Sequence, residues 1–524
     1  MNLVFKTVKK VDQDGKPFLL QKADVTKSRD FWRNWKTCNG QIKRFIQLRR
    51  EDNKWIVYRL FPVIQGTYGQ FKTVYALKDT SGLLSYQISA VRHICRAIID
   101  HNAALDGSDT GTGKTYTALA VARELGLQPA IICKKAGVSG WKRGCMHYRL
   151  KPFFIINWEK AKLCGAGFPY LQRAKDEFSG KYRYRWKMPN GKLLIFDEAH
   201  VANNYGTQNY GMYVSSKGLS SISLSATIAD RPERLQAVMH VLGAMEKGEF
   251  RLFLDGIGHF RNKYDQYESF SNQGDMVQLN KILYPAYGYR ITYNDPDVKR
   301  LFPQGVYRTQ VVNIGTKNGQ KQNKLYNLMV QQAQKDTEMG EQANKLVAEL
   351  RYRQASELLK ADVLCELATD YMDQGMSVCI FVNYLDTLKY ISAKMKTSSL
   401  LFGNQESKGL KRENVLDDFQ NNKKRIIVAM VGCGGQSLDL HDLSGNHPRI
   451  SLICPTYEPI TLRQVLGRTY RAGAKSTPVM NLVYAADTIE EKVAETVNAK
   501  LDNIAAINDG DLMEPDLFNM GVKQ

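Results

Sequence analysis

The sequence predicts an α/β protein with two tandem parallel-sheet lobes, preceded by a small basic domain that is β-rich or α+β. From Leu84 onward, short uninterrupted apolar runs alternate with helical stretches. This is the pattern of buried parallel strands joined by crossover helices, and it occurs twice, on either side of a charged helical stretch. The runs are residues 130–133, 153–156, 193–196 and 222–224 in the first lobe, and 378–382, 425–429, 450–454 and 479–484 in the second.

Length and charge divide the chain further. Its 524 residues exceed one ordinary core, and its net charge is +21. Residues 1–80 hold 17 Lys and Arg against 7 Asp and Glu, a surplus that indicates a polyanion partner such as nucleic acid. We expect a basic accessory domain that binds DNA at 1–80, the first lobe at 81–305, a helical connecting region at 306–372, the second lobe at 373–490, and a C-terminal helix with an acidic tail at 491–524.

Several classes of protein are disfavoured. The nine cysteines include no Cys-x-x-Cys pair, which argues against a zinc site or a disulfide framework and suits a reducing compartment. There is no uncharged apolar run of about 18 residues, so we expect no membrane span, and no signal segment at the start. We therefore expect a monomer in a bacterial or host-cell cytoplasm. The acidic stretch at 509–516 is compatible with a protein-binding site or with a solvated chain end.

A glycine-rich turn at residues 108–115 runs into a helix-forming stretch. Its backbone N–H groups and the following helix N-terminus suit the phosphates of ATP. Lys114 would reach the β- and γ-phosphates, and Thr115 would hold Mg²⁺. Ser108 replaces the usual first glycine, and the turn alone is also compatible with an ordinary helix cap. The residues expected to contact ATP here are Gly111, Thr112, Gly113, Lys114 and Thr115.

One apolar run of the first lobe ends in Asp197 and Glu198, followed by His200. Acidic residues at the carboxyl end of a parallel strand lie at the edge of the sheet where ligands bind. Asp197 would hold Mg²⁺, and Glu198 would orient or deprotonate the attacking water. The next strand ends in Ser225 and Thr227, whose hydroxyls suit hydrogen bonds to the acidic pair. An isolated Asp-Glu pair is commonly a helix cap, but after the glycine-rich loop it predicts an NTPase.

The second lobe lacks a phosphate loop but carries Arg468 and Arg471, three residues apart and so on one face of a helix. Guanidinium groups that neutralise charge on the transferred phosphoryl group raise the rate by roughly 10³–10⁵-fold. We therefore expect both to act as arginine fingers on ATP held between the lobes. The alternative is a solvated basic helix face. Gly434 and Gly435 follow a strand, where backbone can approach a ligand closely.

Aromatic and basic residues alternate around Trp32 and Trp35. Such rings can stack on bases while the cations pair with phosphates. The two tryptophans are also one helical turn apart, as in a small packed core. Both interpretations stay open at this point.

Taken in order, these motifs resemble superfamily 2 helicases, and within them the Snf2-like DNA translocases, over residues 84 to 500. The resemblance implies two RecA-like lobes, ATP and Mg²⁺ as cofactors, and duplex or branched DNA as partner. The compact chain is similar to helicases of large phages, DNA viruses or small bacterial motors. Its Ser225-Ala226-Thr227 departs from the Thr-Gly-Thr usual in the Snf2-like group.

The resemblance also assigns residues by motif. It implies that Gln87 contacts adenine and that Gln464 belongs to the nucleotide site, and it identifies Asp197 to His200 as a DEAH-like motif. Nucleic-acid contacts are implied for Lys135, Trp141, Asn383, Gly434 and Gly435. Coupling roles are implied for His200, Ser225, Thr227 and Asp439.

The leading functional hypothesis is an ATP-dependent DNA helicase or translocase that migrates branches or remodels forks and recombination intermediates. One alternative is an RNA-directed or transcription-linked motor. Another, from a different class, is a nucleic-acid binding or annealing module with weak ATPase activity.

Overall fold

The chain forms two compact units. One contains Met1–Ser108 and Lys114–Arg290, and the other contains Asp109–Gly113 and Ile291–Leu501. The computed structural model describes residues 6–11, 17–28, 32, 46–61, 75–165, 167–175, 177, 180, 182–256, 259–261, 267–269, 279–302, 305–313, 342–403, 405, 412–434, 440–456, 458–471, 473–486, 488, 490 and 493.

The N-terminal region is β-rich, as one of the two predicted forms. Its antiparallel sheet has the order β1 (Lys6–Val11), β2 (Pro17–Asp24), β4 (Lys54–Phe61), β3 (Ile46–Glu51). Ala23 and Val57 lie opposite each other on one face and are buried. The rings of Trp32 and Trp55 meet edge to face with centroids 5.7 Å apart, which supports the packing role for Trp32. Trp35 lies outside the described residues.

The first unit also contains a six-stranded sheet whose neighbouring strands are all parallel. Its order is β14 (Gly288–Tyr289), β5 (Ala103–Asp106), β11 (Ser221–Leu224), β10 (Lys192–Asp197), β6 (Gln128–Cys133), β7 (Phe154–Asn157). The sequence predicted four of these strands. It missed β5 because alanine favours helix over strand, and β14 because two residues show no periodicity.

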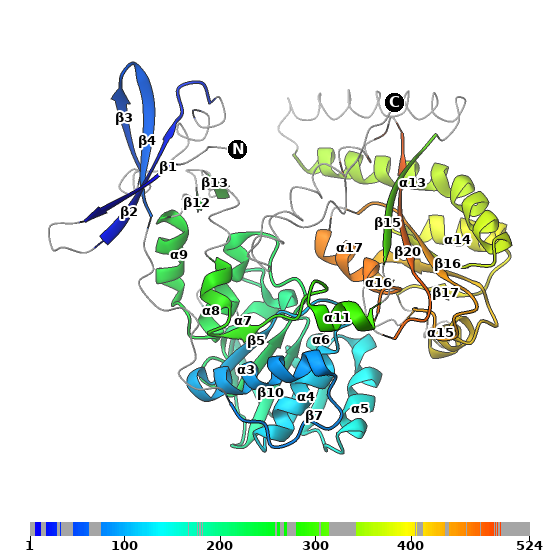
Figure 1. Cartoon of the computed structure of the whole chain (residues 1–524), viewed down its shortest axis with the longest axis horizontal. Helices are drawn as coiled ribbons and strands as arrows, with labels where there is room; N and C mark the ends of the chain where they lie inside the picture. Colours follow the sequence, from blue (N-terminus) through cyan, green and yellow to red (C-terminus); the bar gives the residue numbers. More distant parts are fainter. Residues whose placement is uncertain are drawn as a thin grey trace. The chain divides into compact units, whose positions relative to one another are not determined.

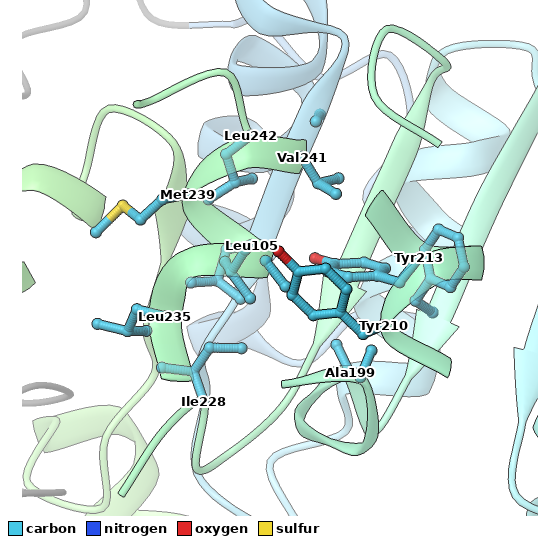
Figure 2. Packing of buried hydrophobic residues seen from close by; sticks show 14 of the residues in the cluster. Leu105, Ala199, Tyr210, Tyr213, Ile228, Leu235, Met239, Val241 and Leu242 are labelled. Atoms are coloured by element: carbon cyan, nitrogen blue, oxygen red, sulfur yellow. The ribbon is translucent and has the colours of Figure 1, made fainter. Parts of the chain in front are cut away.

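Successive residues of these strands enter two different cores, because side chains alternate across a sheet. Ala104 and Ile131 pack with α3 (Ser85–His101), α4 (Lys114–Glu124) and α5 (Val138–His147). Leu105 and Ile132 pack with the elements on the opposite face, and Figure 2 shows Tyr210 and Tyr213 in that core. Those elements include α6 (Trp158–Ala161), α7 (Gln208–Val214), η3 (Pro232–Leu235), α8 (Gln236–Val241) and α9 (Lys247–Gly256).

Shorter elements complete the described part of this unit. They include the 3-10 turns η1 (Lys135–Gly137) and η2 (Ala199–Ala202), the strand pair β8 (Leu171–Lys175) and β9 (Tyr182–Trp186), and the pair β12 (His259–Arg261) and β13 (Tyr267–Ser269).

The second unit contains another six-stranded parallel sheet, which confirms the predicted fold class of two parallel-sheet lobes (Figure 1). Its order is β15 (Val306–Val312), β20 (Val479–Ala485), β19 (Arg449–Ile453), β16 (Ser377–Val382), β18 (Ile426–Met430), β17 (Leu400–Leu401). The sequence predicted helix alone for residues 306–372, but β15 is an edge strand of this sheet.

Helices of the second unit cover the sheet and position its loops. Leu364 on α13 and Leu388 on α14 pack with strand residues such as Ile380 and Leu452. The helices include α11 (Pro296–Leu301), α13 (Gln342–Asp373), α14 (Leu385–Lys394), α15 (Arg412–Gln420), α16 (Val431–Gly434) and α17 (Pro459–Leu466). Across the part of the chain that the structure describes, none of the helices has the length and apolar character needed to cross a bilayer.

Candidate active site

The glycine-rich loop joins β5 to α4, which begins at Lys114. Gly111 and Gly113 have φ angles of +84° and +89°, a left-handed conformation that glycine adopts without steric cost. The Thr112 hydroxyl donates to the Asp109 carbonyl at 2.7 Å. The Lys114 ammonium donates to the Ser108 carbonyl at 2.8 Å, so it folds back over the loop. The loop therefore has a defined shape and places a cation at the start of a helix, where anions bind.

Asp106 and Arg290 form hydrogen bonds with this loop, although the motifs did not point to them. The Asp106 carboxyl is fully buried at the end of β5 and accepts the Ser108 N–H at 3.0 Å, while its second oxygen has no hydrogen-bond partner among the described residues. Burial raises the pKa of Asp106, and the Lys114 charge opposes that rise. Arg290 donates to the Gly107 carbonyl at 2.5 Å. An acidic residue ending a buried strand was the available sequence signal for Asp106.

The acidic pair lies at the same edge of the sheet, because β10 and β5 both flank β11. The Trp141 indole N–H donates to the Asp197 Oδ2 atom at 2.9 Å, and the Trp158 indole donates to the Asp197 carbonyl at 2.9 Å. Burial, and secondly the Glu198 charge, raise the pKa of Asp197 to about 6. Asp197 is thus held at both its side chain and its backbone.

The structure does not support the predicted nucleic-acid contact through the Trp141 side chain. Trp141 is only 2% exposed, and its indole N–H is committed to Asp197, so the ring is not available to a ligand. The same residue instead orients the carboxylate that we expect to hold the metal ion. Burial in the helix that follows η1 was not visible in the sequence, where Trp141 was assigned by its resemblance to a nucleic-acid-binding motif.

Glu198 has a left-handed backbone, with φ 55° and ψ 49°. For a non-glycine residue this conformation costs about 1–2 kcal/mol and is concentrated at functional sites. It turns the chain from β10 into η2 and brings the Glu198 Oε2 atom to 3.3 Å from the His200 Nδ1 atom.

His200 links the acidic pair to the end of β11. Its Nδ1 atom lies 3.1 Å from the Ser225 hydroxyl, which itself donates to the Thr227 carbonyl at 2.9 Å. Because the Ser225 proton is used in that bond, His200 must carry its proton on Nδ1 and donate it. Burial lowers the pKa of His200 to about 4, so the ring is neutral at pH 7. Thr227 contributes its backbone to this chain, and its hydroxyl takes no part.

In the second unit, the loop segment Asp109–Gly113 packs with residues after α17. A Cβ atom on Gly467 would lie 2.7 Å from the Thr110 Cγ2 atom, so glycine is required for this approach. A Cβ atom on Gly111 would lie 3.4 Å from the Arg471 Cγ atom. Arg471 is half-buried and Arg468 is buried. The segment predicted to bind phosphates and the predicted arginine fingers therefore lie together within this unit.

Tyr293 holds the same segment from another direction. Its N–H donates to the Asp109 carboxylate at 2.9 Å, and its hydroxyl donates to the Thr110 carbonyl. The Tyr293 ring packs on Tyr470 with centroids 4.9 Å apart. Sequence reasoning missed Tyr293, because an isolated tyrosine beyond a weak strand carries no motif.

The predicted nucleic-acid contact through the Asn383 amide is also not supported by the structure. The Asn383 Nδ2 atom donates to the Glu357 carboxylate at 2.7 Å and to the Pro455 carbonyl at 2.8 Å. These bonds use both of its side-chain protons. Asn383 therefore fixes the loop after β16, and the sequence could not show this because Glu357 is 26 residues away.

The remaining predicted residues differ in how far the structure describes them. Gln87 is buried and its side-chain oxygen accepts the Leu84 N–H at 3.0 Å, while Gln464 is buried on α17; their contacts with the nucleotide stay predictions. Lys135 is exposed in η1, and Gly434 ends α16. Gly435, Asp439 and the acidic tail lie outside the described residues.

Sequence comparison shows that this chain is similar to helicases. Residues 359–473 match the family described as the helicase conserved C-terminal domain. The chain is 30% identical over 473 residues to a protein of Acanthamoeba polyphaga mimivirus described as a putative ATP-dependent RNA helicase; the match covers 84% of this chain and 86% of that protein.

Two solved structures are also similar to this chain. The first is the SWI2/SNF2 ATPase core of Sulfolobus solfataricus in complex with double-stranded DNA, at 16% identity and a TM-score of 0.34, covering 84% of this chain and 96% of that one. The second is the helicase domain of Hef from Pyrococcus furiosus, at 15% identity and a TM-score of 0.42, covering 80% and 98%.

Proposed function

The chain belongs to the superfamily 2 helicases, which are nucleic-acid-dependent ATPases, and we propose that it couples ATP hydrolysis to movement on duplex or branched DNA. The observation that best supports ATP hydrolysis is that three loops meet at one edge of the sheet. They are the loop before Lys114, the loop with the acidic pair, and the loop with Ser225. These loops follow the adjacent strands β5, β10 and β11, where ligands of parallel sheets bind.

The described residues fit ATP with Mg²⁺. The loop has two left-handed glycines and a cation, as phosphate binding requires. Among the described residues, Trp141 is the one hydrogen-bond donor to the Asp197 carboxylate, so oxygen lone pairs stay available to a cation. Mg²⁺, when bound, would neutralise charge on the phosphates, and Thr115 and Asp197 are the residues that would hold it.

Each remaining residue has a separate role in this proposal. Lys114 exchanges the Ser108 carbonyl for the β- and γ-phosphates, and Glu198 accepts a proton from the attacking water or orients it. The neutral His200 donates its one N–H to Ser225, and its Nδ1 atom, 3.3 Å from the Glu198 Oε2 atom, helps to keep Glu198 in position. Arg468 and Arg471 neutralise the charge on the transferred phosphoryl group, and the contact of Gly111 with Arg471 supports this role.

We expect Lys114→Ala to abolish nucleic-acid-stimulated ATP hydrolysis, because no other described side chain of the loop supplies a cation to the phosphates. Lys281→Ala, at an exposed lysine of the same unit, is the matched control and should leave the rate unchanged. Stimulated hydrolysis at the wild-type rate in Lys114→Ala would show that the ATP site is elsewhere.

The choice of DNA rests on the Snf2-like motifs and on the basic N-terminal sheet, where Arg49, Arg50 and Lys54 are exposed. RNA is the second candidate, because the similar mimivirus protein is described as an RNA helicase. ATPase assays with duplex DNA, a four-way junction, single-stranded DNA and RNA separate the two. We expect duplex or junction DNA to stimulate most, and stimulation by RNA alone would exclude the DNA proposal.

A further inference from the structure

The strands β8 and β9 form a two-stranded ribbon that no motif covers. They pair antiparallel, with Leu171 opposite Trp186 and Lys175 opposite Tyr182. Because side chains alternate across a strand, the ribbon has two distinct faces. Residues 171–187 contain six Lys and Arg against two Asp and Glu, so the ribbon is strongly basic.

The inner face is built into the core beneath the acidic pair. Trp186 is buried, its indole donates to the Met212 carbonyl at 3.0 Å, and its ring meets Phe196 edge to face at 6.2 Å. Phe196 immediately precedes Asp197 on β10. The ribbon therefore packs directly against the strand that carries the proposed metal ligand.

A second set of contacts joins the ribbon to α6. The Tyr184 hydroxyl donates to the Lys162 carbonyl at 3.1 Å, and Lys162 donates its own N–H to the Trp158 carbonyl. Trp158 in turn donates to the Asp197 carbonyl. The core packing therefore reaches Phe196, and this hydrogen-bonded chain reaches the adjacent Asp197.

The outer face has a different character. Arg183 and Arg185 are exposed there, opposite the exposed Ala174 and Gln172 respectively. Two residues apart on one strand, the arginines are about 7 Å from each other along it. Both arginines are exposed, and the residues opposite them in the ribbon are small or uncharged.

We propose that this outer face binds the phosphodiester backbone of the nucleic acid on which the helicase moves. The proposal rests on the proposed function, and it names a contact beyond the motifs of the family. Guanidinium groups in a basic, sequence-independent surface match phosphates, and the ribbon carries few acids that would repel them. Nucleic acid bound to this face would lie on an element packed against the strand of Asp197. Loss of this contact should therefore impair the ATP hydrolysis that nucleic acid stimulates.

The test compares Arg183→Ala/Arg185→Ala with Arg92→Ala/Lys281→Ala, which removes the same charge from exposed positions elsewhere on the first unit. Binding is measured by fluorescence anisotropy with labelled duplex DNA, single-stranded DNA and RNA over a range of salt concentrations. We expect binding about 10-fold weaker in the ribbon variant, and a salt dependence shallower by about 2 in log–log slope, because each phosphate contact contributes about 0.9.

The ATPase assay supplies the second readout. The ribbon variant should need about 10-fold more nucleic acid for half-maximal stimulation, while hydrolysis without nucleic acid stays unchanged. Arg183→Lys/Arg185→Lys should retain most binding, since the charge is kept. Ala174→Glu places a carboxylate opposite Arg183 and should weaken binding with both arginines present, which covers the case that the double variant folds poorly.

The outcomes separate this proposal from the one it rests on. Binding by the ribbon variant equal to that of the control variant would overturn the ribbon surface. A wild-type protein that neither binds nor responds to any of the nucleic acids would instead overturn the proposed function. Weaker binding confined to RNA or to DNA would support the ribbon and identify the polymer that it contacts.

Discussion

Two buried charged clusters, one in each unit, differ in how fully the protein satisfies them. In the first unit, the Asp197 carboxylate accepts one hydrogen bond from the residues that the structure describes, that of Trp141, and the pKa of Asp197 is raised to about 6. In the second unit, the fully buried Lys360 ammonium donates to both Glu490 oxygens, at 2.9 and 2.7 Å, and to the Val483 carbonyl at 2.7 Å.

The acids around Lys360 are equally saturated. Glu490 also accepts the Ala485 N–H at 2.7 Å, and Glu357, one turn from Lys360 on α13, accepts three N–H groups from Asn383 and Tyr384. A buried charge without partners is costly, so full satisfaction marks a structural role. The incomplete satisfaction of Asp197 leaves room for a ligand, as expected of a functional carboxylate.

The prediction with the largest expected effect concerns Asp197, the incompletely satisfied carboxylate. Asp197→Asn should lower ATP turnover on the order of 10³-fold, because the metal ligand is lost. It should also raise the free energy of unfolding at pH 8 without nucleotide. The native pKa of about 6 lies above the ordinary 3.8, so stability is lost as the pH rises from about 4 to about 6 and stays lost at pH 8, and asparagine removes that penalty.

Turnover and thermal unfolding at pH 5 and pH 8 check this prediction. The gain in stability should be larger at pH 8 than at pH 5, because only part of the penalty has accumulated at pH 5, between the unfolded and native pKa values of Asp197. A variant that is less stable than wild type at pH 8 would mean that Asp197 is structural, like Lys360.

The second prediction concerns the saturated cluster. Lys360→Met should lower the free energy of unfolding by about 3–5 kcal/mol, because it leaves buried carboxylates without their cation. Lys394→Met is the matched control, since the Lys394–Asp362 pair is exposed and should contribute far less to the free energy of unfolding. Urea unfolding measures both, and Lys360→Met/Glu490→Leu should recover part of the loss. Equal losses in the free energy of unfolding for Lys360→Met and Lys394→Met would contradict a special structural role for the buried cluster.

The third prediction concerns Trp141, the donor to the Asp197 carboxylate among the described residues. Trp141→Phe keeps the ring but removes its N–H, and should lower kcat/KM for ATP roughly 10–100-fold, as for other residues that orient a metal ligand. Trp158→Phe removes a bond to the Asp197 backbone instead and should have a smaller effect. Steady-state kinetics at saturating nucleic acid distinguish them, and a Trp141→Phe enzyme of wild-type efficiency would contradict the positioning role.

The smallest expected effect is a shift in pH dependence. The wild-type kcat/KM for ATP should fall as the pH drops through about 6, because protonated Asp197 no longer binds a cation. His200, with a pKa of about 4, should add no step between pH 5 and pH 8. The Trp141 hydrogen bond lowers the Asp197 pKa, so Trp141→Phe should move the fall to higher pH. A fall that stays in place or moves to lower pH would show that another group controls it.

The sequence by itself determined the fold class and the order of the motifs. Buried parallel strands are apolar throughout, so runs such as 193–196 and 378–382 were visible, and both are strands of the two sheets. The phosphate loop and the acidic pair were visible for a related reason. Their chemistry needs particular residue types at fixed positions after a strand, and that pattern is local.

Only the tertiary structure decided which side chains are available to ligands. Trp141 and Asn383 matched motifs for nucleic-acid contact, yet their donors are used by Asp197 and by Glu357 with Pro455. Asp106, Tyr293 and the β8–β9 ribbon had no motif at all. Burial and hydrogen-bond partners depend on residues distant in the chain, whereas a motif records only neighbours along it, so accessibility is settled by packing.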